Sequence, residues 1–389
     1  MSAAQIMGMV GVSAFTALLR TFTEAWSLTN TEAGWISGAF FAGYMIAVPV
    51  LSSLTDRIDT RRLYLAFTAF GGLTAVAYAL VAEGFWSALV IRSAAGIALA
   101  GTYMPGLKLL TDLVQGPGRT RAFAIYTSCY SVGIALSYLI TGETEAVLGW
   151  RWAFAVAAVG SVAAFALVLA AAPPDPPPEA RPEASLLDFR PVFRNREAMG
   201  YIIAYGAHMW ELYGQRAWIV AFLIFSLSLQ DGAPGAIVSA AVIAFAVNLA
   251  GVSGNLVCNE FAMRIGRVRV ATAVALVSIA LSATIGFTAS WPYGVVVALC
   301  IIYGITTYGD SAAVIGGAVI TAPPGQAGMT MAVLSFFGFA SAGLGALVFG
   351  VVLDLAGGGT SGLAWGLAFA SLGVAALVGP VALRLLIRE

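Results

Sequence analysis

The sequence predicts an all-α membrane protein with twelve transmembrane helices in two six-helix bundles. Of its 389 residues, 60% are hydrophobic and only 10% are charged, whereas a soluble domain carries about 25% charged residues. The apolar residues fall into twelve runs of a length that can cross about 30 Å of hydrocarbon. One long polar interval divides these runs six and six.

The first six runs make up the predicted N-terminal bundle, residues 1–172. The first run lacks a positively charged start and a clear small-residue cleavage site, so it is interpreted as a permanent span rather than a signal peptide. The six predicted spans cover residues 2–21, 32–54, 63–81, 85–107, 121–142 and 151–172.

The polar interval 173–197 is interpreted as a linker. It opens with Pro-Pro-Asp-Pro-Pro-Pro, and prolines interrupt helices and favour extended conformations. The C-terminal bundle is expected over residues 198–389. Its six predicted spans cover residues 198–225, 235–258, 268–288, 292–313, 327–353 and 362–386.

The distribution of basic residues predicts the orientation. Fifteen of the 19 Lys and Arg residues lie in the linker, at the C-terminus or in loops on the same side of the membrane. Basic loops remain in the cytoplasm, so both termini and the linker are expected there, with the chain in a bacterial inner membrane. The formal net charge is zero, which disfavours a nucleic-acid partner.

The two halves repeat each other weakly, at an offset near 207 residues. Parallel repeats of this kind are typical of transporters whose substrate site lies between the halves near the middle of the membrane. The matching pairs include Gly96 with Gly304, Gly101 with Gly309, Pro117 with Pro324, and Ser128 with Ser335.

The loop after the second span carries the first family resemblance. It reads Ser-Ser-Leu-Thr-Asp-Arg-Ile-Asp-Thr-Arg-Arg from residue 52 to residue 62 and resembles the loop Gly-x-Leu-Ala-Asp-Arg-x-Gly-Arg-Arg of the major facilitator superfamily. The resemblance covers nearly the whole chain and implies that fold, with twelve transmembrane helices.

That resemblance also implies a gating motif. In the superfamily the loop stabilises the outward-facing state, with its aspartate near the start of the eleventh helix, where the helix dipole favours a negative charge. Asp56 and Arg57 match the motif directly, and Arg61 is expected to pair with Asp112 at the end of the fourth span. Ser52, Asp59 and Thr60 depart from the superfamily pattern. The alternative to a gating role is that the basic residues of this loop only keep it on the cytoplasmic side of the membrane.

A second motif lies in the fourth span, where Arg92-Ser-Ala-Ala-Gly96 resembles the superfamily pattern Arg-x-x-x-Gly. The resemblance implies that Arg92 takes part in proton coupling. The fifth span lacks the Gly-Pro pair that is usual in proton-driven drug exporters of the superfamily, which disfavours drug antiport.

The seventh span holds the densest group of polar residues. His208, Glu211 and Gln215 recur at helical spacing, so this stripe is expected to face a cavity or other helices rather than lipid. Glu211 is the first candidate for proton coupling, because burial penalises the charged form of a carboxylate, with His208 beside it. The alternatives are a static ion pair of Glu211 with Arg92 or Arg20 and a structural role for His208.

Arg20 and Arg216 come from corresponding helices of the two halves. Together they are predicted to clamp a carboxylate through bidentate hydrogen bonds; alternatively, Arg20 pairs with Glu24. Asp310 is interpreted as a gating or coupling residue, or as a simple helix-end charge. The remaining candidates for lining the substrate site, with Gln215, are Trp210, Tyr213 and Tyr308.

The sequence shows no phosphate-binding P-loop, no zinc-ligand spacing and no nucleophile elbow. We therefore expect no cofactor, no metal and no enzymatic activity. The predicted function is secondary active transport of a small solute by alternating access, by a monomer, with protons as the coupling ion and an organic anion such as a monocarboxylate as substrate. The alternative is proton-coupled export of hydrophobic or cationic compounds.

Overall fold

The computed structural model describes residues 1–55, 57–114, 118–173, 189–230, 239–324 and 326–387. Within these ranges all regular secondary structure is helical. Among these described residues, ten helical segments are long and apolar enough to cross a membrane, as the composition predicts.

The two other predicted spans are helical but differ from the ten. The first is broken into α1 (Ser2–Gly8), α2 (Ala14–Ala17) and α3 (Leu19–Trp26). The seventh is α11 (Arg196–Ser228), which has 33 residues, ample for a span. Its polar side chains lower its mean hydropathy, which is why it stands apart from the ten.

The chain divides into two compact units, one of residues Met1–Trp26 and Ala39–Pro182 and the other of Ser27–Gly38 and Glu183–Glu389. The division between 182 and 183 falls within the predicted linker. The segment Ser27–Gly38, expected in the N-terminal bundle, belongs instead to the second unit, because the first turns of α4 (Asn30–Leu54) pack on α16 (Ala327–Leu355).

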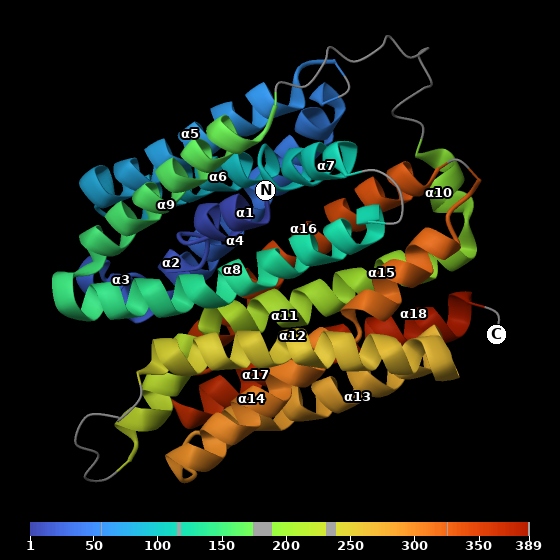
Figure 1. Cartoon of the computed structure of the whole chain (residues 1–389). Coiled ribbons are helices and arrows are strands. Elements are labelled where there is room, and N and C mark those ends of the chain that lie inside the picture. The colour runs from blue at the N-terminus through green and yellow to red at the C-terminus, as the bar shows by residue number, and fades with distance from the viewer. Residues whose placement is uncertain (56, 115–117, 174–188, 231–238, 325, 388–389) are drawn as a thin grey trace. The chain divides into compact units, whose positions relative to one another are not determined.

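The first unit contains α1 to α3, the part of α4 from Ala39 onward, and α5 to α9. Within it, α5 packs extensively on α9. Figure 1 shows these helices running side by side in blue and green. The helices not yet given are α5 (Thr60–Val81), α6 (Phe85–Ala100), α7 (Tyr103–Leu113), α8 (Gly118–Leu148) and α9 (Trp150–Ala171).

The second unit is built around α11, which packs along most of α16, while α12 packs on α14 and α13 packs on α17. Its core holds, among others, Tyr201, Ile202 and Val314. The helices are α10 (Arg190–Arg194), α12 (Ala240–Ile265), α13 (Arg267–Ile285), the 3₁₀ helix η1 (Gly286–Thr288), α14 (Tyr293–Gly309), α15 (Ser311–Ile320), α17 (Gly362–Ala376) and α18 (Val378–Leu386).

Short polar side chains set several helix starts. Thr29 and Glu32 form a capping box at the start of α4: the Glu32 carboxylate accepts from the Thr29 backbone N–H at 2.8 Å, and the Thr29 hydroxyl accepts from the Glu32 N–H at 3.1 Å. Asp59 caps α5 by accepting from the backbone N–H groups of Arg61 and Arg62. These contacts satisfy N–H groups that lack a partner within the helix.

Two predicted spans are interrupted at equivalent positions. The span formed by α6 and α7 breaks at Gly101 and Thr102, and the span formed by α14 and α15 breaks at Asp310, 208 residues beyond Thr102. Interrupted helices expose backbone groups and helix ends inside a membrane protein, and such sites commonly bind ions or substrates.

The internal repeat is also visible in how helices touch within each unit. Gly96 on α6 packs against the backbone of Phe40 on α4, and Gly304 on α14 packs against the backbone of Val247 on α12. The two glycines are 208 residues apart and their partners 207 apart, so each unit repeats the same close helix crossing at the offset that the sequence predicts.

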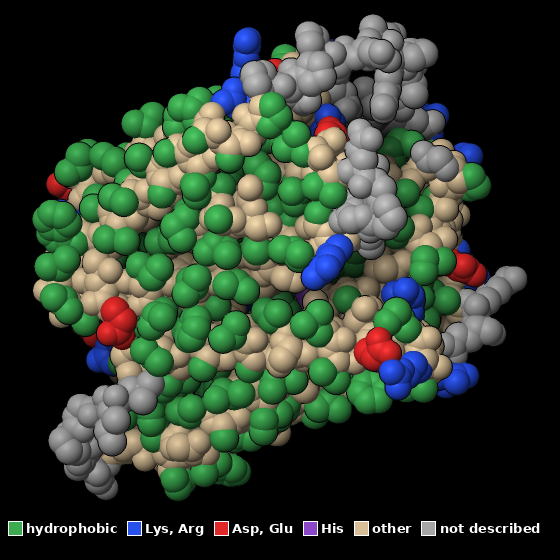
Figure 2. All heavy atoms as spheres, in the orientation of Figure 1, with side chains coloured by type: hydrophobic (Ala, Val, Ile, Leu, Met, Phe, Trp, Pro, Cys, Tyr) green, Lys and Arg blue, Asp and Glu red, His purple; other side chains and the backbone are tan. Residues whose placement is uncertain are grey.

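Apolar side chains cover the outside of the helices. Trp86, Leu73, Leu256 and Val374 are each more than 60% exposed, and Figure 2 shows hydrophobic side chains spread over the visible face, with charged ones near helix ends. Water would penalise so much exposed apolar surface, whereas the hydrocarbon of a bilayer accepts it.

Candidate functional site

The polar stripe of α11 is buried, as its helical spacing predicts. The exposed fractions are 5% for His208, 4% for Glu211, 2% for Gln215 and 5% for Arg216. Polar groups buried to this extent need partners, and the partners define three neighbouring groups within the second unit.

Glu211 belongs to a group of hydroxyls. The Ser278 hydroxyl on α13 donates to Glu211 Oε1 at 2.8 Å, and Ser278 Oγ lies 3.2 Å from Thr307 Oγ1 on α14. Thr307 in turn donates to the carbonyl of Tyr303 at 2.6 Å. Because hydroxyls both donate and accept, this arrangement suits Glu211 in either protonation state.

His208 lies against Asp310. Nδ1 of His208 is 2.7 Å from Oδ1 of Asp310, yet the two atoms are not aligned as a hydrogen bond. Asp310 stands at the break between α14 and α15, where Asn255 Oδ1 accepts from the backbone N–H of Ala312 at 3.0 Å. The structure thus brings together two predicted coupling residues that are 102 positions apart in the sequence.

Arg216 is held by neutral groups. Its Nε donates to Asn248 Oδ1 on α12 at 2.9 Å, and Asn248 is itself fixed by donating to the carbonyl of Ala244 at 2.8 Å. The guanidinium carbon lies 4.9 Å from the ring centroid of Tyr213 and 4.7 Å from that of Tyr308, which are cation–π contacts. Glu211 and Arg216 each take a partner from another helix.

Two further candidates carry polar atoms with no hydrogen-bond partner among the described residues. These atoms are Nε2 of Gln215 and Nε1 of Trp210. The Trp210 side chain as a whole is half-buried. Both atoms are donors, which a bound substrate could satisfy.

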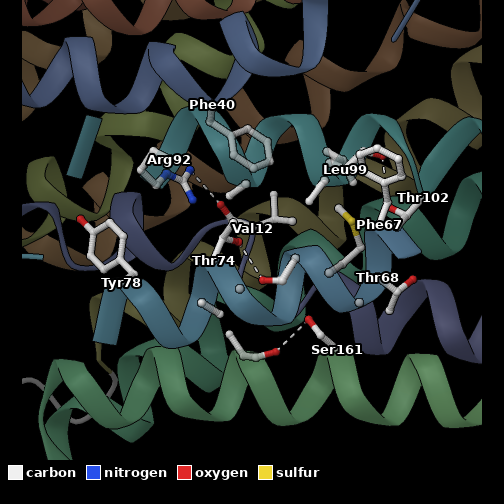
Figure 3. Close-up of a pocket in the computed structure, with 18 of the residues that line it drawn as sticks. Val12, Phe40, Phe67, Thr68, Thr74, Tyr78, Arg92, Leu99, Thr102 and Ser161 are labelled. Carbon is white, nitrogen blue, oxygen red and sulfur yellow. Dashed lines mark hydrogen bonds between the residues drawn. The ribbon is translucent and has the colours of Figure 1, made fainter. Parts of the chain in front are cut away.

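The candidates in the first unit lie in two different environments. Arg92 is 4% exposed and lines a cavity (Figure 3). Arg20 forms an exposed ion pair with Glu24 at 2.7 Å, the alternative that the sequence left open. The clamp formed by Arg20 and Arg216 stays a prediction.

The predicted gating motif is only partly described. Asp56 lies outside the described residues, and the Arg57 side chain is exposed. The expected pairing of Arg61 with Asp112 is wrong. Arg61 Nη2 donates to the carbonyl of Leu169 at 2.6 Å, and Asp112 pairs with Lys108 at 3.0 Å, one helical turn away, where a partner on the same helix needs no tertiary contact.

Sequence reasoning missed Ser278, Thr307 and Asn248. Serine and threonine are common in apolar helices, where they usually bond to their own backbone, so Ser278 and Thr307 give no signal by themselves. Asn248 does give one, because an amide inside an apolar run tends to hydrogen-bond to another helix.

The family follows from comparison with known proteins. A model described as Major Facilitator Superfamily matches residues 1–346. The chain belongs to this superfamily. It is therefore a multi-pass membrane protein of a transporter family rather than of an enzyme family.

Curated relatives within the superfamily match over part of their length. The chain is 28% identical over 152 residues to "Probable sphingolipid transporter spinster homolog 1" of Arabidopsis thaliana, covering 38% of this chain and 30% of that protein. It is 26% identical over 133 residues to the D-galactonate transporter of Escherichia coli, covering 34% of this chain and 31% of that protein. The chain thus spans about a third or less of the length of these relatives.

Solved structures match over the whole chain. A bacterial homologue of the human lysosomal transporter Spinster, in an inward-facing and unoccupied conformation, superposes with a TM-score of 0.74 at 17% identity, covering 99% of this chain and 96% of that one. The nucleoside transporter NupG superposes with a TM-score of 0.78 at 14% identity, covering 100% of this chain and 98% of that one. These likenesses show the fold.

Proposed function

We propose that this superfamily member is a proton-coupled secondary transporter of a small organic anion, working by alternating access. One observation carries the proposal: a single helix, α11, presents both a buried carboxylate surrounded by hydroxyls and a buried guanidinium oriented by neutral groups. The first suits reversible protonation and the second suits recognition of an anion.

Arg216 supports the choice of an anion. Asn248, Tyr213 and Tyr308 fix the orientation of its guanidinium without contributing a negative charge of their own. A carboxylate is the natural partner for a planar guanidinium in a site of low dielectric constant. Trp210 and Gln215 supply further donors on the same helix, and Arg20 of the first unit is proposed to complete the clamp.

Glu211 supports proton coupling. Its carboxylate is 4% exposed, and burial penalises the charged form, so protonation and substrate binding can influence each other. Ser278, with Thr307 beside it, offers a hydroxyl to either form. His208, on the same helix as Glu211, and Asp310, at the break that follows α14, supply a second titratable pair. We infer that protons bind and leave through this group, with Arg92 contributing from the first unit.

The relatives are consistent with an organic anion. D-galactonate, the substrate named for the Escherichia coli relative, is a carboxylate. A hydrophobic or cationic substrate is the second candidate, favoured by the relative named as a probable sphingolipid transporter. In that case Glu211 would bind the cation and the aromatic residues would contact its apolar part.

The test uses the purified full chain in proteoliposomes with an imposed pH gradient. Uptake of a radiolabelled monocarboxylate or sugar acid is expected to depend on the gradient, with competition by other small carboxylates and none by lipophilic cations. Arg216→Ala should abolish this uptake, whereas Arg264→Ala, which removes an exposed arginine paired with Glu260 at 2.7 Å, should leave it intact. Competition by cations alone would favour the second candidate instead.

Coupling is tested separately. Glu211→Gln should abolish accumulation driven by the pH gradient but permit exchange of substrate across the membrane at equal pH. The matched control is Glu260→Gln, at an exposed acid on α12. Unchanged proton-driven accumulation by Glu211→Gln would refute the coupling role.

A further inference from the structure

The first unit contains a cavity of about 80 Å³ for which the proposed function names no ligand. It is lined by residues of α1, α4, α5, α6 and α9 (Figure 3). Arg92, which is proposed to contribute to coupling, lies on its wall, whereas Glu211, Arg216 and their partners belong to the second unit and do not line it.

Arg92 places a positive charge on the wall of the cavity. Its side chain is buried, with Nη2 donating to the carbonyl of Val12 at 3.2 Å and Cζ 4.5 Å from the ring centroid of Phe40. Nε has no hydrogen-bond partner, and no salt bridge includes Arg92, within the part of the chain that the structure describes. Arginine remains protonated, and a buried charge without a counter-charge is strongly unfavourable.

Tyr78 supplies a second donor on the same wall. Its side chain is 1% exposed, its hydroxyl has no hydrogen-bond partner among the described residues, and like Arg92 it lines the cavity. Stacking on Phe154, with ring centroids 4.0 Å apart and planes 11° apart, fixes the ring. An unsatisfied buried hydroxyl costs free energy that a bound acceptor would recover.

Most other hydroxyls of the lining are already engaged. Thr68, Thr74 and Ser161 each donate to a backbone carbonyl of their own helix, and Thr102 donates to the carbonyl of Leu99. Among the described lining residues, the buried donor atoms without a hydrogen-bond partner are Nε of Arg92 and the hydroxyl of Tyr78.

We propose that this cavity binds one small monovalent anion of the size of chloride, held by the Arg92 guanidinium and the Tyr78 hydroxyl. The volume supports this size: an engineered apolar cavity that binds benzene measures about 150 Å³, and one water occupies about 30 Å³ of liquid. A cavity of about 80 Å³ has room for one such anion and a water. A sugar acid or a lipid does not fit. The bound anion would supply the negative charge that Arg92 otherwise lacks.

The first experiment measures thermal stability of the purified full chain in chloride-free methanesulfonate buffer, which contains no carboxylate. Methanesulfonate is replaced by chloride or bromide at constant ionic strength, and the melting temperature is expected to rise and then saturate, because a ligand that binds the folded state stabilises it. A wild-type protein with no such rise would overturn the proposal. Formate and acetate form a second arm, measured in Arg216→Ala so that the proposed carboxylate site of the second unit does not contribute, and a larger response to them than to the halides would assign the cavity to a carboxylate and overturn the choice of a halide.

Variants of the cavity residues test whether the halide effect on the melting temperature arises at this cavity. Arg92→Gln should abolish the halide effect, and Tyr78→Phe should weaken the apparent affinity about tenfold, as loss of one hydrogen bond to a charged group predicts. The control is Arg151→Gln, since Arg151 also stacks on an aromatic ring, 4.4 Å from the Trp150 centroid, but is exposed. A halide effect that persists unchanged in Tyr78→Phe and Arg92→Gln contradicts the proposal.

A direct measurement remains if Arg92→Gln does not fold. Crystals of the wild-type protein grown in bromide should show an anomalous scattering peak within hydrogen-bonding distance of Arg92. Absence of a peak there at saturating bromide overturns the proposal. Neither result bears on Glu211 or Arg216, so the proposed function stands or falls by its own test.

Discussion

The carboxylate of Asp354, at the end of α16, binds the start of α4 through Thr31. Oδ2 of Asp354 accepts from the Thr31 backbone N–H at 2.7 Å and from its hydroxyl at 2.6 Å. Oδ1 accepts from the side chain and backbone of Asn30 at 2.8 and 3.2 Å. A residue 323 positions away thus satisfies N–H groups in the first turn of α4.

Asp354→Ala is expected to lower the free energy of unfolding by about 1–2 kcal/mol, because it removes a helix cap and a negative charge at a helix start. Asp354→Asn should cost less, since it keeps an acceptor and loses only the charge. The melting temperature in detergent measures both. Asp112→Ala, which removes an exposed ion pair with Lys108, serves as control and should change stability by less than about 0.5 kcal/mol. Equal effects of Asp354→Ala and Asp112→Ala would contradict the capping role.

The contact between His208 and Asp310 predicts non-additive variants. His208→Gln and Asp310→Asn should each slow proton-driven uptake, and the double variant should be little slower than the worse single one. A double-mutant cycle on initial uptake rates at fixed pH should give a coupling energy of about 0.5–3 kcal/mol. Additive effects would show that the two residues act independently.

Asn248 is expected to position Arg216 for the substrate. Asn248→Ala removes the acceptor for Arg216 Nε and should raise KM for an anionic substrate about tenfold, the cost of one hydrogen bond to a charged group, with a smaller change in kcat. Arg216→Lys should not restore transport, because an ammonium group lacks the planar fork. A KM that Asn248→Ala leaves unchanged would argue against this positioning role.

Close helix packing makes Gly96 sensitive to any side chain. A Cβ at this position would overlap the carbonyl oxygen of Phe40, and overpacking of this kind costs about 1–3 kcal/mol, so Gly96→Ala should lower the melting temperature clearly. Gly294→Ala is the matched control, since nothing lies within 4 Å of a Cβ there. Its melting temperature should be equal or slightly higher, because alanine favours helices.

Much of this fold is predictable because membrane constraints are local. Runs of apolar residues long enough to span hydrocarbon predict the helices, and the offset between Gly96 and Gly304 predicts the repeated crossing within each unit. Gly101 and Gly309, which the repeat pairs with each other, lie where α6 and α14 end. The sequence alone did not predict that these helices end at the two glycines.

The candidate site is less predictable. The sequence singled out His208, Glu211 and Arg216 because ionisable residues are rare in apolar spans. It did not predict their partners. Ser278 cannot be distinguished in the sequence from the many other serines of the apolar spans. The expected pair of Arg61 with Asp112 is not formed, since Asp112 pairs instead with Lys108, one turn away on the same helix.

Composition and periodicity over about 20 residues predict that this protein spans a membrane, which segments are helical and which helix concentrates the buried charges. These properties are predictable because the cost of exposing polar groups to lipid acts on each segment separately. The contacts of His208 with Asp310, of Asn248 with Arg216 and of Asp354 with the start of α4 emerge only when the helices pack together. Such contacts join residues that are distant in sequence, and they depend on how helices pack, which no single segment encodes.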